Sequence, residues 1–172
     1  MAGEETKHWK FHHLGVIVGD MEKAVEYYKS LGFIDVVPQG PAPAKPTAWE
    51  ELTVYGKHVI KDGETLIPGS PDAKPPVPNT WCRIGEISLE LIQPGERPGA
   101  KDVNREFLEN VGDGIDHIAY TVDSEHFDAE VAKMESKGLD IILSGRLPGG
   151  FRFVYFDTRK YGGIVTEFMK SM

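Results

Sequence analysis

Two patterns of apolar and polar positions each occur twice along the chain. The run "FHHLGVIVGD" (residues 11–20) is rich in Val, Ile and Leu, which predicts a strand, and "MEKAVEYYKSLGF" (residues 21–33) has apolar residues at helical spacing. About a hundred residues later, "GIDHIAYTVD" (residues 114–123) and "SEHFDAEVAKMESKGLD" (residues 124–140) repeat this order. In both copies a glycine ends the predicted helix. The chain therefore predicts two units that begin with a strand and a helix.

Each predicted helix is followed by further strands, and each set of strands contains one carboxylate in an apolar run. "WCRIGEISLELIQP" (residues 81–94) predicts a hairpin around Gly85, and "FRFVYFDTRKYGGIVTEFMK" (residues 151–170) predicts two strands around a turn. Glu90 lies within "SLELI", and Glu167 lies within "IVTEFM". The repetition of the acidic positions strengthens the interpretation of the chain as an internal duplication.

An alignment of the two copies places His13 on His117. It also places Leu14 on Ile118, Gly15 on Ala119 and Val18 on Val122. Chance placement of two histidines on strands is the alternative explanation, and the matching strand sets with their acids argue against it.

Residues 38–80 interrupt the first copy and contain nine of the twelve prolines. Proline fixes its own backbone angle and has no N–H for a strand ladder, so this stretch cannot be a continuous central strand. We expect a long loop around one or two strands, such as "WEELTVYG" (residues 49–56). A loop of this length in a compact domain often covers a site or takes part in it.

Histidine and glutamate at four matching positions point to metal chemistry. A buried carboxylate needs a partner or a proton, and one of His12 and His13 must face away from the other on a strand. If the halves close around a shared cavity, His13, Glu90, His117 and Glu167 converge. Imidazole and carboxylate suit Zn, Ni, Co, Fe or Mn, with coordination positions left for substrate. The alternatives are surface pairing of each Glu with Arg, and histidines that are hydrogen-bonded core residues.

Composition limits the class of protein. With 172 residues and 40% hydrophobic content, the chain is long enough for one domain with an apolar core. The net charge of −8 is spread along the chain, which argues against a nucleic-acid partner. Cys82 is the single cysteine, and there is neither a secretory h-region nor an apolar run of about 18 residues. We therefore expect a cytoplasmic protein with no membrane partner.

These residues resemble the vicinal oxygen chelate superfamily, which includes glyoxalase I, bleomycin-resistance proteins, extradiol dioxygenases and methylmalonyl-CoA epimerase. The resemblance covers about residues 11–37 and 77–170, and it is nearest to the epimerase branch in "FLENVGDGIDHIAYTVD". It implies an α+β, glyoxalase-like fold, in which two βαβββ modules form a cupped partial barrel around a metal.

By this resemblance, residues 1–172 form a single domain. Module one spans about residues 10–95, with the Pro-rich insertion at 38–80, and module two spans about residues 113–170. The resemblance also implies a homodimer.

The resemblance implies that the metal ligands are His13, Glu90, His117 and Glu167, while His12 supports the strand. The implied cofactor is a divalent metal ion such as Co, Ni, Zn, Mn or Fe. Glu167 and Glu90 are the expected catalytic bases as well as ligands.

Three features differ from the epimerase pattern. The epimerases usually have glutamine at the position of Glu90. A glutamate at this position fits glyoxalase I at least as well. No acid stands near Asn79, where the epimerases have their other catalytic acid, so Glu50 or Glu51 of the insertion would have to replace it. The phosphate-contacting segment reads "DTRK" (residues 157–160), which leaves Arg159 and Lys160 as cations.

The expected function is that of a metal-dependent isomerase, epimerase or lyase that stabilises the enolate of a small-molecule substrate with two neighbouring oxygens. Methylmalonyl-CoA epimerase is the best match. The alternatives are a glyoxalase I-like lactoylglutathione lyase, an iron-dependent dioxygenase and a metal-free binding protein of the resistance type. Aromatic residues such as Trp49, Tyr55 and Trp81 are candidates to line a substrate pocket.

Overall fold

The structure is a computed structural model that describes residues 6–38, 49–66, 79–95 and 101–171. The strands are β1 (Trp9–Ile17), β2 (Ile34–Pro38), β3 (Glu51–Val54), β4 (Lys57–Lys61), β5 (Glu64–Thr65), β6 (Thr80–Ile84), β7 (Ile87–Ile92), β8 (Gly114–Val122), β9 (Ile141–Arg146), β10 (Arg152–Phe156) and β11 (Val165–Lys170). The helices are α1 (Met21–Ser30), α2 (Val103–Asn110), α3 (Phe127–Ser136) and α4 (Arg159–Gly162).

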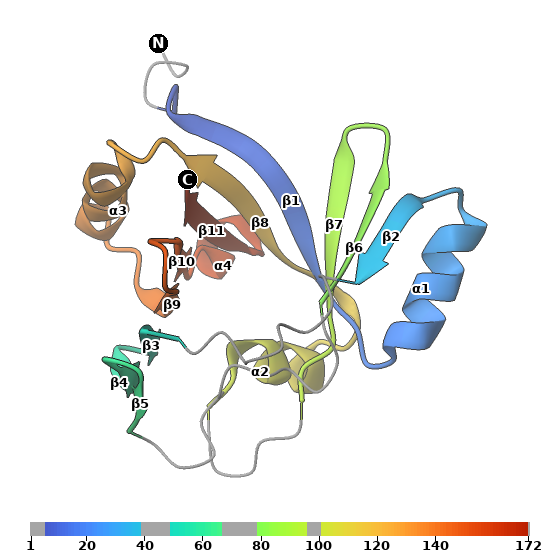
Figure 1. The fold of residues 1–172 in the computed structure, drawn as a ribbon, viewed down its shortest axis with the longest axis horizontal. Coiled ribbons are helices and arrows are strands. Elements are labelled where there is room, and N and C mark those ends of the chain that lie inside the picture. The colour runs from blue at the N-terminus through green and yellow to red at the C-terminus, as the bar shows by residue number, and fades with distance from the viewer. Residues whose placement is uncertain (1–5, 39–48, 67–78, 96–100, 172) are drawn as a thin grey trace.

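All strands of the described residues join one eleven-stranded sheet, which is strongly curved (Figure 1). Its order is β2-β6-β7-β1-β8-β11-β10-β9-β3-β4-β5. The first half contributes β2-β6-β7-β1, and the second half contributes β9-β10-β11-β8 in the same internal order. The predicted α+β fold of two βαβββ modules in a cupped sheet is therefore confirmed.

The two halves meet where β1 pairs antiparallel with β8. On either side of this pair, β7 runs parallel to β1 and β11 runs parallel to β8. The register between β1 and β8 shifts twice, once between Phe11 and His13 and once between Gly15 and Val16. The four central strands are thus related by an approximate two-fold symmetry.

The insertion in the first half completes the sheet of the second half. Strand β3 pairs antiparallel with β9, with Leu52 opposite Gly145 and Val54 opposite Leu143. Pairing with β3 covers the edge that β9 would otherwise expose. The predicted strand in residues 49–56 is therefore present. It belongs to the first half of the sequence but pairs with a strand of the second half. The Pro-rich runs at 39–48 and 67–78 lie outside the described residues.

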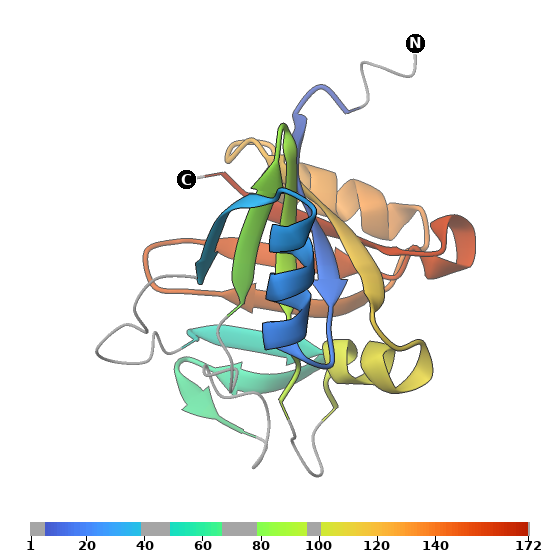
Figure 2. The ribbon, with the colours of Figure 1, turned by 90° about the vertical axis from the view of Figure 1, so that its right-hand side faces the viewer.

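Helices α1 and α3 cover the outer face of the two halves (Figure 2). The carboxylate of Asp20 caps α1 by accepting a hydrogen bond from the Lys23 N–H, and Met21 packs into the cluster that contains Val16, Cys82 and Leu91. Helix α3 buries an apolar stripe against β10 and β11; the residues of this cluster include Phe127, Met134, Val154, Phe156 and Phe168. Among the described residues, no helix has both the length and the apolarity to cross a membrane.

Helix α2 has no counterpart among the sequence predictions. It is only eight residues long and fully buries only Val103, so it offers few positions from which to recognise a helical pattern. Its start is fixed by the Asp102 side chain, which accepts hydrogen bonds from the N–H groups of Asn104 and Arg105. The Arg105 side chain donates to the carbonyls of Pro94 and Gly95. Capping and a guanidinium contact therefore position this helix.

Cys82 is only 1% exposed in the core beneath α1, and burial raises the pKa of its thiol to about 11. A thiol with this pKa forms roughly 100-fold less thiolate near neutral pH than an ordinary cysteine does. We therefore expect a thiol-disulfide exchange reagent such as DTNB to label the native protein at least that much more slowly than the protein in urea. Equal labelling rates would contradict this packing of β6.

Candidate metal centre

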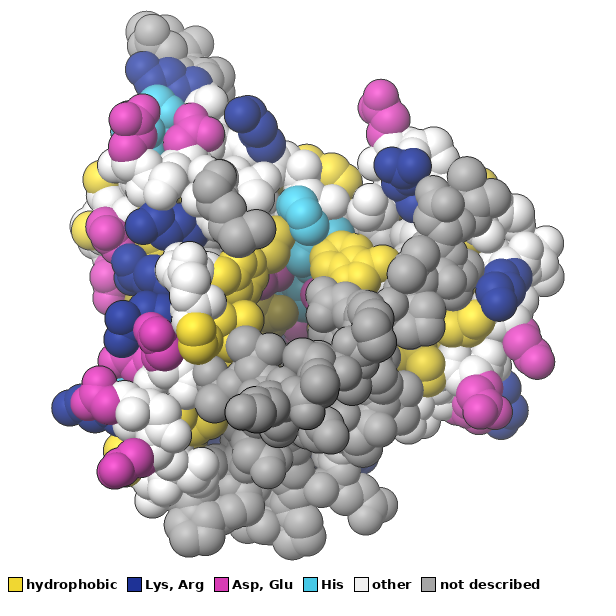
Figure 3. All heavy atoms as spheres, viewed as in Figure 1, with side chains coloured by type: hydrophobic (Ala, Val, Ile, Leu, Met, Phe, Trp, Pro, Cys, Tyr) yellow, Lys and Arg dark blue, Asp and Glu magenta, His cyan; other side chains and the backbone are white. Residues whose placement is uncertain are grey.

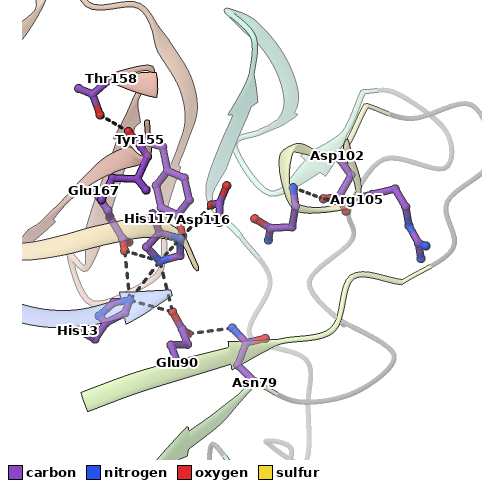
Figure 4. A network of polar contacts seen from close by, with 12 residues as sticks. His13, Asn79, Glu90, Asp102, Arg105, Asp116, His117, Tyr155, Thr158 and Glu167 are labelled. Carbon is purple, nitrogen blue, oxygen red and sulfur yellow. Dashed lines mark hydrogen bonds and ion pairs between the residues drawn. The ribbon is translucent and has the colours of Figure 1, made fainter. Parts of the chain in front are cut away.

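Four side chains from four neighbouring strands meet at the middle of the sheet (Figure 4). They are Glu90 on β7, His13 on β1, His117 on β8 and Glu167 on β11. His13 Nε2 lies 3.1 Å from Glu90 Oε2, 3.2 Å from His117 Nε2 and 3.5 Å from Glu167 Oε2. His117 Nε2 lies 3.4 Å from Glu167 Oε2 and 4.0 Å from Glu90 Oε2. The structure thus brings together all four residues that the sequence predicts as ligands.

The strand register explains this convergence. On the same face of the sheet, Gly15 is paired with both Glu90 and His117, and Ala119 is paired with both Glu167 and His13. Each imidazole therefore lies opposite a small residue of the other half, next to that half's carboxylate. The same face of the sheet receives one His and one Glu from each half.

Gly15 makes room for the ring of His117. A Cβ atom on Gly15 would lie 1.8 Å from Cε1 of His117 and 2.1 Å from its Nε2. No side chain fits at that distance, so the absence of a Cβ at this position lets the imidazole lie across β1. Gly15 and Ala119, which align in the two halves of the sequence, are therefore the equivalent residues opposite His117 and His13.

An aromatic side chain accompanies each half of the site. Trp81 is paired with Glu90 and its ring lies 4.8 Å from that of His13, while Tyr155 is paired with Glu167 and lies 4.7 Å from the ring of His117. The Tyr155 hydroxyl is 3.3 Å from His117 Nε2. Sequence analysis considered Trp81 and missed Tyr155. Extending the alignment to the strand before each Glu would have matched these two residues.

The two carboxyl groups of the site differ in their proton affinity. Burial raises the pKa of Glu167 to about 8, because the opposing attraction of His117 is smaller and Glu90 adds repulsion. Burial also acts on Glu90, but its hydrogen bond and charge interaction with His13 outweigh burial and lower its pKa. Glu90 is therefore held as a carboxylate, while Glu167 binds a proton more readily.

The two imidazoles also differ. Burial lowers the pKa of His13 despite the nearby Glu90. Burial acts in the same direction on His117, but the hydrogen bond with Asp116 and the charge of Glu167 overcome it and raise its pKa. His117 is thus the more basic of the pair.

The donor atoms fit a divalent cation. His13 Nε2 faces Glu90 Oε2, His117 Nε2 and Glu167 Oε2, and a single N–H proton can serve only one of these acceptors. Glu167 Oε2 is buried without a hydrogen bond from any described residue. Donors that each lie about 2.1 Å from one ion stand roughly 3.0 to 4.2 Å apart, which includes the separations of 3.2 to 3.5 Å among His13, His117 and Glu167. The distances of 3.1 and 4.0 Å from Glu90 Oε2 to the two imidazoles also lie in this range. The surplus of lone pairs and the spacing both suit a metal.

Further polar residues surround the four candidate ligands. His12 Nδ1 lies 2.8 Å from His13 Nδ1, and Asp116 Oδ2 lies 3.0 Å from His117 Nδ1. His12, which we expected only to support the strand, thus contacts a candidate ligand. The Asn79 amide donates to Glu90 Oε1 at 2.9 Å. Asn79 therefore orients Glu90 at the place where an additional acid was sought.

Several sequence expectations for side chains near the site are corrected by the structure. Glu50 and Glu51 do not replace the missing acid, because both form ion pairs with Arg146 at partly exposed positions, at 3.3 and 3.5 Å. The pairing of Glu90 and Glu167 with Arg at a sheet edge is also wrong, since both carboxylates are buried on central strands.

The cations of the "DTRK" segment are in contact with neighbouring side chains. Arg159 donates two hydrogen bonds to Asp157, at 2.8 and 2.6 Å. Lys160 Nζ lies 5.5 Å above the ring of Tyr161. The guanidinium charge of Arg159 is therefore largely balanced by an adjacent carboxylate.

A second group of potential ligands, His8, Asp123 and His126, lies near the start of β1. The rings of His8 and His126 stack with centroids 3.5 Å apart and planes 11° apart, and His8 Nδ1 is 3.4 Å from Asp123 Oδ2. Parallel stacked rings direct their in-plane lone pairs side by side, away from a common point. We therefore interpret this cluster as a contact that fastens the residues before β1 to α3.

One face of the molecule is hollowed near its centre. Figure 3 shows histidine and acidic atoms deep in this face of the molecule, with hydrophobic side chains on both sides. The four candidate ligands themselves are buried, with exposed fractions from 0% for His117 to 9% for Glu90.

Comparison with known proteins identifies the class. The profile of the Glyoxalase/Bleomycin resistance protein/Dioxygenase superfamily matches residues 12–156. The chain therefore belongs to this superfamily, which is also called the vicinal oxygen chelate superfamily. No curated protein matches the sequence.

Solved structures with the same fold include several methylmalonyl-CoA epimerases. The enzyme from Mycobacterium tuberculosis is 18% identical with a TM-score of 0.58, over 94% of this chain and 87% of that chain. The enzyme from Streptomyces coelicolor, in complex with 2-nitronate-propionyl-CoA, is 18% identical with a TM-score of 0.59, over 94% and 96%. A hypothetical protein from Bacillus halodurans C-125 is 19% identical with a TM-score of 0.59, over 95% of both chains. At these identities the likeness establishes the fold.

The close approach of Gly15 to His117 gives a test of the site geometry. In Gly15→Ala the new methyl group must displace the imidazole, and we expect the affinity for Co²⁺ or Zn²⁺ to fall roughly 100-fold or more. Gly114→Ala is the matched control, because its Cβ would lie 3.8 Å from Phe107, an ordinary contact. Metal titration against a competing chelator measures both variants, with circular dichroism to check folding. Undiminished affinity in folded Gly15→Ala would rule out His117 as a ligand in this orientation.

Proposed function

We propose that this protein is a divalent-metal-dependent isomerase, epimerase or lyase that works through an enolate. The observation that carries the proposal is the convergence of His13, His117 and Glu167 at separations that suit one cation, with Glu90 beside both imidazoles. A bound divalent ion supplies a Lewis acid that polarises a substrate carbonyl and stabilises the adjacent carbanion as an enolate. The superfamily and the structural neighbours, most of which are enzymes, support an enzymatic role.

The chain supplies two carboxylates for proton transfer next to that carbonyl. Glu167 is the first candidate base, because its Oε2 atom is buried, faces the centre and accepts no hydrogen bond from the described residues. It takes the proton from the substrate carbon, and the C–H electron pair moves into the enolate. Glu90, from the opposite half, takes up a proton beforehand, from solvent or from the other epimer in the reverse direction, and delivers it to the other face of the carbon. Loss of a proton on one face and gain of a different proton on the other then inverts the configuration.

Among substrates, a methylmalonyl-CoA-like thioester is the best guess. It has two neighbouring carbonyl-type oxygens and an acidic C–H between them, which is the chemistry the two acids serve. The epimerase neighbours include one in complex with methylmalonyl-CoA, which supports this choice by analogy of fold. Arg159 already forms an ion pair with Asp157. It would therefore have to leave Asp157 in order to bind a coenzyme A phosphate.

Two other functions fit fewer features of the site, and a third is a close alternative. An iron-dependent dioxygenase uses two His and one carboxylate, which leaves Glu90 unexplained. A metal-free binding protein has no need of buried, converging His and Glu side chains, which are costly to desolvate. A glyoxalase I-like lyase shares the enolate chemistry and the Glu at position 90, and it is the closest alternative.

Metal analysis and isotope exchange together test the proposed reaction. The purified protein is loaded with Co²⁺, incubated with methylmalonyl-CoA in deuterium oxide and followed by mass spectrometry. We expect about one metal ion per chain and incorporation of one deuterium at the carbon between the carbonyls. Exchange into lactoylglutathione instead would favour the glyoxalase alternative, oxygen consumption with a catechol would favour the dioxygenase, and a chain that binds no metal would favour the binding protein.

Glu167→Gln separates proton transfer from metal binding. The amide keeps the shape and an oxygen ligand but cannot accept the proton, so we expect deuterium exchange to fall roughly 10² to 10⁴-fold while metal content largely persists. Glu130→Gln is the control, since Glu130 is also buried but accepts a hydrogen bond from the Trp9 indole, which an amide oxygen can still accept. Full exchange activity in Glu167→Gln would exclude it as the base, and Glu90→Gln tests the return of the proton in the same way.

A further inference from the structure

Each of the two shifts in register between β1 and β8 inserts a single extra residue into one strand. Phe11 is opposite Tyr120 and His13 is opposite Ala119, so that His12 is the extra residue on β1. Gly15 is opposite His117 and Val16 is opposite Ile115, so that Asp116 is the extra residue on β8. Each extra residue directly precedes one of the two histidines of the site. The two bulges are therefore equivalent under the approximate symmetry of the halves.

The bulges change the direction of the inserted side chains. In a regular strand, successive side chains point to opposite faces, so residues 12 and 116 would point away from the histidines that follow them. A bulge bends the strand and can re-aim a side chain. Here His12 reaches His13 Nδ1 at 2.8 Å, and Asp116 reaches His117 Nδ1 at 3.0 Å. In both halves the preceding residue touches the ring nitrogen that faces away from the centre.

This contact determines which ring nitrogen is free to bind a metal. A neutral imidazole carries one proton, and an acceptor beside Nδ1 favours the tautomer in which Nδ1 donates and Nε2 keeps its lone pair. The Nε2 atoms of His13 and His117 are the ones that face each other and the two glutamates. An acceptor at Nδ1 therefore prepares each ring as a ligand and holds its orientation.

We propose that His12 and Asp116 are positioning residues that the paired bulges deliver to the two histidine ligands, with Asp116 the more important. The proposal rests on the metal centre of the proposed function. The two partners differ in strength: Asp116 is a carboxylate that is 1% exposed, whereas His12 is an imidazole at an exposed position. Asp116 Oδ1 accepts no hydrogen bond from the described residues, so the contact with His117 accounts for the polar interaction of this buried carboxylate.

Asp116→Asn tests the proposal through metal affinity. The amide is the same size but weakens the acceptor at Nδ1, and we expect the Kd for Co²⁺ or Zn²⁺ to rise roughly 10 to 100-fold. Asp113→Asn is the matched control, because Asp113 accepts a hydrogen bond from the Gly19 N–H, a bond that an asparagine oxygen can also accept. Wild-type protein that binds no metal would refute the proposed function itself. Wild-type binding with an unchanged Kd in Asp116→Asn would overturn the positioning proposal alone.

The histidine tautomers give a readout that a purely structural role would not change. In ¹⁵N spectra of the metal-free protein, recorded at a pH high enough for His117 to be neutral, we expect His117 to carry its proton on Nδ1. In Asp116→Ala the two tautomers should mix, while the tautomer of His13 stays as in the wild type. Identical His117 tautomers in wild type and variant would contradict the proposal, and this measurement needs neither metal nor activity.

His12 provides a second, independent pair of variants. In His12→Asn, the side-chain oxygen can take the place of Nδ1 as acceptor, so we expect metal affinity close to that of the wild type. In His12→Leu the acceptor is lost, and we expect a Kd increase that is smaller than that of Asp116→Asn because water can reach this exposed position. Equal affinities of His12→Asn and His12→Leu, or a larger effect at His12 than at Asp116, would overturn the proposed roles.

Discussion

The antiparallel pairing of β1 with β8 is the interaction on which the candidate site depends. Its register sets His13 opposite Ala119 and His117 opposite Gly15, so that both imidazoles lie on one face and reach across the junction. A slip of one residue would turn the side chains of one strand to the opposite face. The carboxylates on the outer neighbours, β7 and β11, would then lose their imidazole partners. The site is therefore a property of the junction, and neither half contains it alone.

The approximate symmetry of the junction places equivalent residues, but their surroundings make them chemically different. Glu90 accepts a hydrogen bond from Asn79, lies 3.1 Å from His13 Nε2 and has a lowered pKa, whereas Glu167 is dominated by burial and has a pKa of about 8. Likewise the basic His117 contacts a carboxylate, and the less basic His13 contacts another histidine. The duplicated strands thus carry one glutamate, Glu90, that stays ionised and another, Glu167, that binds a proton more readily.

The parts of the fold that follow from short-range patterns could be predicted from the sequence. Strands β1, β7 and β8, helices α1 and α3 and the four converging side chains follow from apolar periodicity and from the alignment of the halves. Helix α2 could not, because it spans only eight residues and its position depends on the long-range contacts of Arg105 with Pro94 and Gly95. The contact of Asp116 with His117 could not either, since strand alternation puts neighbouring residues on opposite faces and a bulge leaves no local sequence signal. The use of β3 as a strand of the second half depends on a long-range pairing.

Because of the pairing of β3 with β9, the candidate ligands and the apolar residues beside them come from different parts of the chain. Leu52 and Val54 on β3 share a face with Leu143 and Tyr155 through successive antiparallel pairs, and they belong to one apolar cluster with Phe153. The apolar wall beside His117 is therefore built partly by the insertion, while the four candidate ligands come from the duplicated strands. Changes in the insertion can alter what the hollow accepts without moving β1 against β8. A superfamily that keeps its central strands and varies its insertions can thereby apply the same site to different substrates.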